Sequence, residues 1–304
     1  MPTDRRWPNL FLIGAQKSGT TTLATMLSHH PAVYMSAPKE PGFLAFGERG
    51  YPYHGGDGAP APASRWVVDS ESAYLALFCR APTRARYLGD ASTWYLAEPG
   101  TAERIRAVCD DPRILVILRQ PAERAYSAWC HARREGEEPL PDFGAALAAE
   151  ASRDRHSHLL RYRQMGCYAT QLKRYLRVFG REQLLVMRYE DLRDEPAALW
   201  ARCTDFLGLN ADGEPPASHR QNRSGQPRSR LLHRLLKNER FKAAAKRCLP
   251  WSLTSWSKAR LDELNLRRFP PLPAREREAL TAYFRPEIDE LEQLTGLSLD
   301  DWKR

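Results

Sequence analysis

Residues 10–22 read LFLIGAQKSGTTT and contain the clearest local signal of the architecture. The apolar run 10–13 predicts a buried strand, and the glycine-rich turn after it leads into a helical pattern over Thr20–His29, ended by Pro31. Such a turn presents unpaired N–H groups and the positive end of a helix dipole. The segment therefore predicts a phosphate site where the first strand meets the first helix.

The spacing of this turn is close to the nucleotide-binding pattern G-x-x-x-x-G-K-[ST], with the lysine displaced. Thr20 occupies the lysine position, and Lys17 lies in the middle of the turn instead. The apolar run 114–118 is also not followed by the acidic residue that would coordinate magnesium. We therefore expect phosphate binding with no metal site, and a metal-dependent nucleoside triphosphatase is disfavoured.

Apolar runs followed by helical patterns recur along the chain and predict βα units with a parallel sheet. We expect an α/β fold: a P-loop-like three-layer domain with a central parallel sheet flanked by helices, plus a C-terminal helical appendix. One domain covers 1–304, with the α/β core at 9–230 and the helical segment at 231–304. The further predicted strands are 86–88, 114–118 and 184–187, and the further helices are 122–134, 168–179, 196–207, 231–260 and 274–294.

The charge of the chain is concentrated in one late segment. The 304 residues carry 46 Lys and Arg against 37 Asp and Glu, but residues 220–268 hold 14 of these cations and only three acids. That segment has no recognisable nucleic-acid recognition motif, so we expect no nucleic-acid partner. Its part 231–268 contains an amphipathic leucine pattern and would contact a membrane surface weakly, attract an acidic acceptor or form a homodimer.

Composition limits the class of protein. With 42% hydrophobic residues the chain can bury a core. No stretch has the roughly 18–20 apolar residues of a membrane span, and the run 10–13 is too short for a signal-peptide core. The six cysteines include no C-x-x-C pair, which argues against a zinc site or a redox dithiol. We expect a soluble, cytoplasmic protein.

A second candidate phosphate motif follows the strand at 114–118. Arg119 ends this strand, and Ser127 lies about two turns into the next helix. A guanidinium and a hydroxyl from two elements can hold one phosphate between them. The neighbouring Arg124 and Arg134 are predicted to lie on a solvated face of that helix.

These two motifs resemble those of the sulfotransferases that use 3′-phosphoadenosine 5′-phosphosulfate (PAPS), in their bacterial and heparan-type branch. The resemblance covers roughly residues 9–230 and the last helix. It implies a 5′-phosphosulfate loop, a 3′-phosphate site at Arg119 and Ser127, and a late loop at 222–229 in which Arg228 also binds the 3′-phosphate. The implied loop residues are Lys17, Ser18, Gly19, Thr20 and Thr21.

Two further segments resemble the acceptor side of that family. Residues 39–43, KEPGF, are similar to Lys-Glu-x-His-Phe, in which the glutamate is the catalytic base, with Gly42 at the histidine position. Residues 89–95, GDASTWY, are similar to Asp/Glu-x-Ser-Pro-x-Tyr, with Thr93 at the proline. The implied catalytic residues are Lys17 and Glu40, and the candidate acceptor contacts are Lys39, His54, Asp90, Ser92, Trp94 and Tyr95.

Other interpretations of these residues remain open at this point. Glu40 can form a solvated ion pair with Lys39, and His54 is a second candidate base. Asp90 can cap a turn, and Trp94 and Tyr95 can pack in the core.

The resemblance implies that the chain transfers a sulfuryl group from PAPS to an acceptor hydroxyl, without a metal, by in-line displacement. A glycan, a lipid-linked sugar or a secondary metabolite would be the acceptor. Two alternatives are a metal-dependent P-loop kinase acting on a small molecule and a non-catalytic binder of anionic surfaces.

Overall fold

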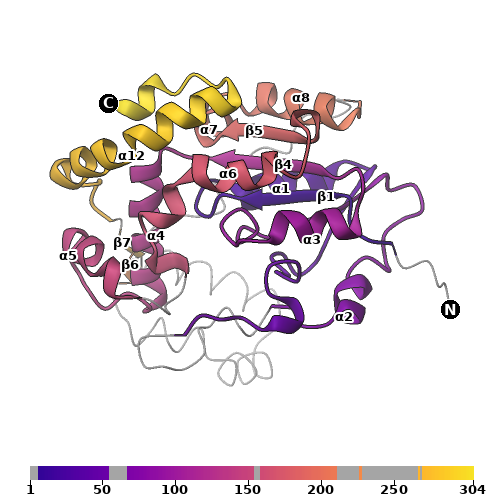
Figure 1. Cartoon of the computed structure of the whole chain (residues 1–304), viewed down its shortest axis with the longest axis horizontal. Helices are drawn as coiled ribbons and strands as arrows, with labels where there is room; N and C mark the ends of the chain where they lie inside the picture. Colours follow the sequence, from indigo (N-terminus) through magenta and orange to yellow (C-terminus); the bar gives the residue numbers. More distant parts are fainter. Residues whose placement is uncertain (1–5, 55–66, 154–157, 211–225, 228–265, 268) are drawn as a thin grey trace.

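The computed structural model describes residues 6–54, 67–153, 158–210, 226–227, 266–267 and 269–304. A five-stranded, fully parallel sheet lies at its centre, in the order β2-β3-β1-β4-β5 (Figure 1). The strands are β1 (Leu10–Gly14), β2 (Val33–Met35), β3 (Tyr87–Asp90), β4 (Arg113–Leu118) and β5 (Leu184–Arg188).

Helices cover both faces of this sheet, which confirms the predicted three-layer α/β fold. They are α1 (Thr20–His29), α2 (Glu71–Ala76), α3 (Thr101–Val108), α4 (Pro121–Glu135), α5 (Phe143–Ala148), α6 (Tyr168–Leu176), α7 (Tyr189–Asp194), α8 (Pro196–Leu207) and α12 (Ala274–Thr295). Short 3₁₀ turns are η1 (Gly47–Arg49), η3 (Ala149–Ser152), η4 (His158–Leu160), η5 (Gln164–Gly166), η6 (Arg181–Gln183) and η7 (Asp300–Lys303), and β6 (Gln226–Pro227) pairs antiparallel with β7 (Leu266–Arg267).

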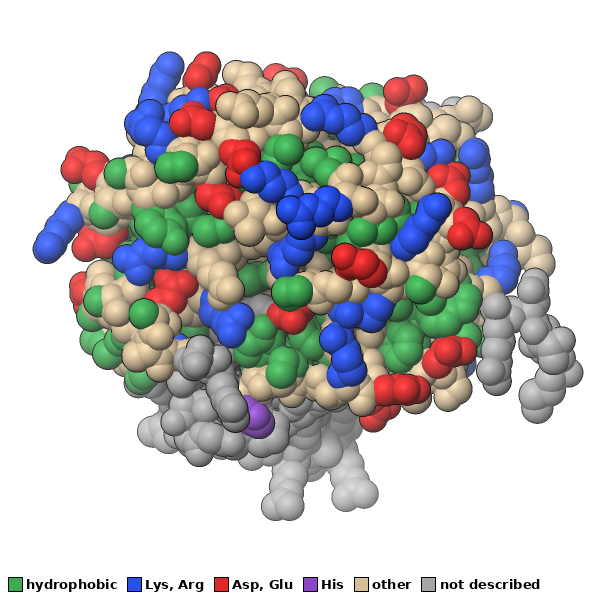
Figure 2. Space-filling view, viewed as in Figure 1, with side chains coloured by type: hydrophobic (Ala, Val, Ile, Leu, Met, Phe, Trp, Pro, Cys, Tyr) green, Lys and Arg blue, Asp and Glu red, His purple; other side chains and the backbone are tan. Residues whose placement is uncertain are grey.

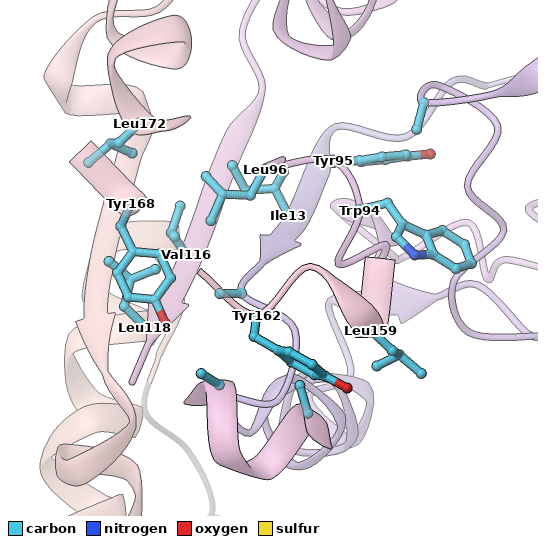
Figure 3. Close-up of a cluster of buried hydrophobic side chains, with 14 of the residues drawn as sticks. Ile13, Trp94, Tyr95, Leu96, Val116, Leu118, Leu159, Tyr162, Tyr168 and Leu172 are labelled. Atoms are coloured by element: carbon cyan, nitrogen blue, oxygen red, sulfur yellow. The ribbon is translucent and has the colours of Figure 1, made fainter. Parts of the chain in front are cut away.

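Successive side chains of each buried strand point to opposite faces of the sheet, so two separate apolar cores form. Leu10 and Leu12 of β1 pack with residues of α1 and α8 on one face of the sheet. Phe11 and Ile13 point to the other face, toward the core that includes α4, α6 and α12. Figure 3 shows this second core, where Tyr168 and Leu172 of α6 approach the sheet. Burial on both faces explains why these strands read as continuous apolar runs in the sequence.

Most long elements agree with the sequence predictions. The helix predicted over 168–179 ends at Leu176, and Phe179 is buried in the loop after it. Four short helices (α2, α3, α5 and α7) and the three-residue strand β2 were not predicted, because segments of three to eight residues carry too few periods of a pattern. The predicted helix at 231–260 lies outside the described residues.

Charges of both signs are interspersed on the face drawn in Figure 2, around patches of apolar side chains. This agrees with the near balance of charge outside residues 220–268. None of the helices in the described ranges is long and apolar enough to cross a bilayer.

Candidate active site

The candidate residues follow the carboxyl ends of neighbouring parallel strands. Lys17 comes after β1, Glu40 after β2, Thr93 after β3 and Arg119 after β4. In open α/β sheets, ligands bind at this edge. The parallel register of the sheet therefore gathers side chains that are up to about 100 positions apart in the sequence.

The turn after β1 has the open N–H geometry of an anion site. Gly19 caps α1 in the left-handed region, at φ 88°, and a Cβ there would lie 2.9 Å from Leu192 and from Tyr189. The first turn of α1 holds no acidic residue, and no side chain caps it. Ser18 Oγ is buried beside the Tyr168 hydroxyl, and Gln16 Oε1 is buried with no hydrogen-bond partner among the described residues. A helix N-terminus without a capping side chain, next to a buried hydroxyl, has the donors that a bound phosphate needs.

Lys17 lies inside a cluster of charges. Its pKa is lowered to about 8, because burial disfavours the ammonium and the charge of Arg134 repels it, while Glu40 opposes this effect. Arg119 lowers the pKa further, and Glu135 raises it. Lys17 thus lies within electrostatic range of both Arg119 and Glu40.

The Arg119 motif lies where β4 passes into α4. Arg119 approaches Glu123 Oε2 at 3.4 Å, and its guanidinium lies 5.0 Å from the centre of the Tyr189 ring. Tyr168 donates a hydrogen bond of 2.9 Å to the Arg119 carbonyl. Glu123 and Ser127 lie four residues apart and are the partly exposed positions of the otherwise buried stretch 121–130, so both face the same open stripe of α4.

Of two further arginines on α4, one does not lie where the sequence predicted. Arg124 is fully buried and donates to the Tyr162 carbonyl, so its prediction as a solvated residue was wrong. Arg134 is only 22% exposed, pairs with Glu135 at 3.1 Å and lies near Lys17. The error for Arg124 has a physical cause: α5, α12 and the η4–η5 region cover α4 and leave one stripe open, on which the partly exposed Arg134 lies. His131, which belongs to neither sequence motif, also lies on that stripe and contacts Arg134 at 2.7 Å.

Glu40 is held by partners on both carboxylate oxygens. Lys39 Nζ lies 2.7 Å from Oε1, and Thr93 Oγ1 donates to Oε2 at 3.0 Å. Within the described ranges, Glu40 (φ 62°) and Lys17 (φ 69°) are the only non-glycine residues with positive φ. This conformation costs a non-glycine residue roughly 1–2 kcal/mol. Strain of this kind is concentrated at functional sites.

A buried carboxylate, Asp90, supports the loop that carries Glu40 through a network of hydrogen bonds. Asp90 is fully buried and accepts hydrogen bonds from Tyr74 (2.6 Å), Ser92 (2.7 Å) and Tyr95 (2.7 Å). Burial raises the pKa of Asp90, while the three hydroxyl donors act in the opposite direction. The Ser92 and Tyr95 oxygens in turn accept from the backbone N–H groups of Gly42 (3.0 Å) and Leu44 (3.1 Å).

This network changes the interpretation of the predicted acceptor contacts. Asp90, Ser92 and Tyr95 have no exposed surface and hold the loop that carries Glu40, so they support the site rather than face an acceptor. Trp94 is 4% exposed and packs edge-on to Phe46 at 5.5 Å. Gly42 has a φ of +65°, and a Cβ there would lie 3.1 Å from the Trp94 ring, so a larger residue at this position would be strained.

The remaining candidate site residues are Lys39, His54 and Arg228. Lys39 is a quarter exposed beside Glu40. His54 is the last described residue before 55–66 and makes no hydrogen bond to Lys17 or Glu40 within the described chain. Arg228 lies outside the described residues. No three His, Cys, Asp or Glu side chains of the described ranges are grouped as metal ligands.

The sequence profile of the sulfotransferase family matches residues 8–213, from the start of β1 to beyond α8. The chain belongs to the sulfotransferase family. This match spans both candidate phosphate motifs and the Glu40 loop, and it decides against the kinase and the non-catalytic alternatives.

Curated relatives in this family are longer than the chain. Bifunctional heparan sulfate N-deacetylase/N-sulfotransferase 2 of Mus musculus is 32% identical over 213 residues, which are 67% of this chain and 22% of that protein. Enzyme 4 of the same name and organism is 26% identical over 98% of this chain and 31% of that protein. The chain thus spans about a third of the length of these relatives.

A solved sulfotransferase matches nearly the whole chain. The sulfotransferase from Alicyclobacillus acidocaldarius has 32% sequence identity and a TM-score of 0.75, over 98% of this chain and 99% of that one. The sulfotransferase fold therefore includes the C-terminal helical region.

Proposed function

We propose that this sulfotransferase transfers a sulfuryl group from PAPS to an acceptor hydroxyl, with Glu40 as the general base. The observation that carries the proposal is the pairing of Lys17 and Glu40. These two residues share the rare left-handed backbone conformation and lie close enough for Glu40 to raise the pKa of Lys17. An acid–base group and a cation held together at the sheet edge are the two groups that the reaction needs.

The choice of PAPS rests on two anion sites next to each other. The turn after β1 and the Arg119 motif after β4 follow strands that are hydrogen-bonded neighbours in the sheet. Adjacent strands are about 4.8 Å apart. A nucleotide with phosphates at both its 5′ and 3′ positions can therefore reach both sites at once, whereas a nucleotide with only a 5′-phosphate leaves Arg119 and Ser127 unused.

Each residue has a defined part in the transfer. PAPS supplies the sulfuryl group when bound. Glu40 takes the proton of the acceptor hydroxyl while the oxygen of that hydroxyl forms the new O–S bond. General-base catalysis of this kind raises a rate by about 10²–10⁴-fold. Lys17 and the N–H groups at the start of α1 stabilise the negative charge on the 5′-phosphate oxygen when its bond to sulfur breaks. Lys39 and Thr93 keep the Glu40 carboxylate oriented.

The acceptor is the second substrate of the proposed transfer. The curated relatives named above are N-sulfotransferases of heparan sulfate, and the acceptor here is proposed to be a hydroxyl of a glycan, a lipid-linked sugar or a secondary metabolite. A screen with ³⁵S-labelled PAPS over sugars, amino sugars, phenols and lipid alcohols separates hydroxyl from amine acceptors.

Calorimetry tests the donor site without knowledge of the acceptor. We expect adenosine 3′,5′-bisphosphate (PAP) to bind in the presence of EDTA with micromolar affinity and AMP to bind more weakly. Glu40→Gln should bind PAP normally and lose turnover, because only the proton acceptor is removed. Equal affinities for PAP and AMP would contradict the donor assignment, and normal turnover by Glu40→Gln would exclude Glu40 as the base.

A further inference from the structure

A carboxylate lies beside the proposed 3′-phosphate site, where it is unfavourable for anion binding. Glu123 follows Arg119 by four residues and precedes Ser127 by four, on the open stripe of α4. Its Oε2 atom lies 3.4 Å from the Arg119 guanidinium, the group proposed to bind the phosphate. An uncompensated Glu123 would pair with Arg119 and repel a phosphate dianion.

The C-terminal helix supplies a countercharge for this carboxylate. Arg277, in the first turns of α12, forms a close ion pair with the other oxygen of Glu123, Oε1. α12 packs against α4 in the structure, and Figure 1 shows it crossing the start of that helix. The contact between Glu123 and Arg277 is much closer than the contact between Glu123 and Arg119.

We propose that Arg277 is a positioning residue for the nucleotide: it neutralises Glu123 and so leaves Arg119 available to the 3′-phosphate. The proposal rests on the proposed use of PAPS. It makes recognition of the 3′-phosphate depend on a residue 154 positions away from Glu123, on a helix outside both nucleotide motifs.

The proposal makes a specific prediction about ligand discrimination. Loss of Arg277 leaves a full negative charge within about 4 Å of Arg119, at the partly exposed edge of the site. Interactions of one to two kcal/mol at such a surface change an affinity about 5- to 30-fold. PAP affinity should fall by this factor, and AMP affinity should stay the same, because AMP has no 3′-phosphate.

A double-mutant cycle with calorimetry tests this prediction. PAP and AMP are titrated into the full chain as wild type, Arg277→Gln, Glu123→Gln and the double variant. We expect Arg277→Gln to lower the PAP-to-AMP affinity ratio, and the double variant to restore it, because the repelling carboxylate is then absent. Arg275→Gln is the matched control: it removes an exposed arginine of the same helix turn and should leave the ratio unchanged.

The outcomes separate this inference from the donor assignment. A wild-type chain that does not prefer PAP over AMP contradicts the proposed function itself. A wild-type preference that survives in Arg277→Gln, or that Glu123→Gln fails to restore in the double variant, overturns the role of Arg277 alone. Urea unfolding of each variant identifies any loss that comes from a misfolded chain.

Discussion

Replacing either of two buried tyrosines by phenylalanine should have unequal effects, although each loses one hydroxyl. Tyr74 and Tyr95 both donate to the same Asp90 oxygen, at 2.6 and 2.7 Å. Only the Tyr95 hydroxyl also accepts a hydrogen bond from the Leu44 N–H, in the loop that follows Glu40. The comparison therefore separates support of Asp90 from support of the loop.

The magnitudes follow from the number of bonds lost. A hydrogen bond to a charged group contributes about 1.5–3 kcal/mol, so Tyr74→Phe should lower the free energy of unfolding by about that amount. Tyr95→Phe loses a similar bond and leaves the Leu44 N–H buried without an acceptor, which costs about 1–3 kcal/mol more. Displacement of the Glu40 loop by about 1 Å would also lower turnover by up to about 100-fold.

Urea unfolding and turnover of PAPS by the two variants provide the test. Tyr95→Phe should be the less stable variant and should lose turnover by a larger factor, while PAP binding stays near the wild-type value in both. Equal losses of stability, or a larger loss of turnover in Tyr74→Phe, would refute the idea that the Asp90 network holds the Glu40 loop.

Three other outcomes are expected. PAP affinity should fall as the pH rises through about 8, because Lys17 loses its proton and its positive charge there. The phosphates do not contribute to this fall, since their charge is constant above their pKa of about 6. Lys17→Met should bind PAP weakly at every pH between 7 and 9.5. Gly19→Ala should lower the free energy of unfolding by about 2–5 kcal/mol, because alanine is strained at this left-handed φ and its Cβ would lie 2.9 Å from Leu192 and Tyr189. Urea unfolding measures this loss, and a loss below about 1 kcal/mol would contradict the prediction. Thr93→Val should lower kcat, because Glu40 loses the donor that orients its carboxylate, and Thr93→Ser should restore it; an unchanged kcat in Thr93→Val would exclude Thr93 from orienting the base.

Local patterns in the sequence were sufficient to predict the strands and the turn on which the site is built. The apolar runs of β1, β4 and β5 and the glycine-rich turn with Lys17 are each read within about ten residues, and they depend little on distant contacts. Because parallel strands end at one edge, the fold class placed Arg119 and Lys17 at the same edge of the sheet, and the pairing of β1 with β4 makes them neighbours there. The Glu40 segment came from a family resemblance, since its strand β2 is only three residues long.

The supporting interactions could not be predicted in the same way. The Asp90 network needs Tyr74, which lies 16 residues away on a short helix with no motif of its own. Burial of Arg124 depends on covering elements far along the chain, and periodicity gives no signal for them. The pairing of Glu123 with Arg277 joins two ordinary surface-type residues, which only the packing of α12 on α4 brings together.

A crystal structure of the chain grown with PAP would test the central claim most directly. We expect the 5′-phosphate to contact Lys17 and the first N–H groups of α1, and the 3′-phosphate to contact Arg119 and Ser127, with Glu40 facing the position of the transferred group. A nucleotide bound away from the carboxyl edge of the sheet, or one whose 3′-phosphate does not contact Arg119, would contradict it.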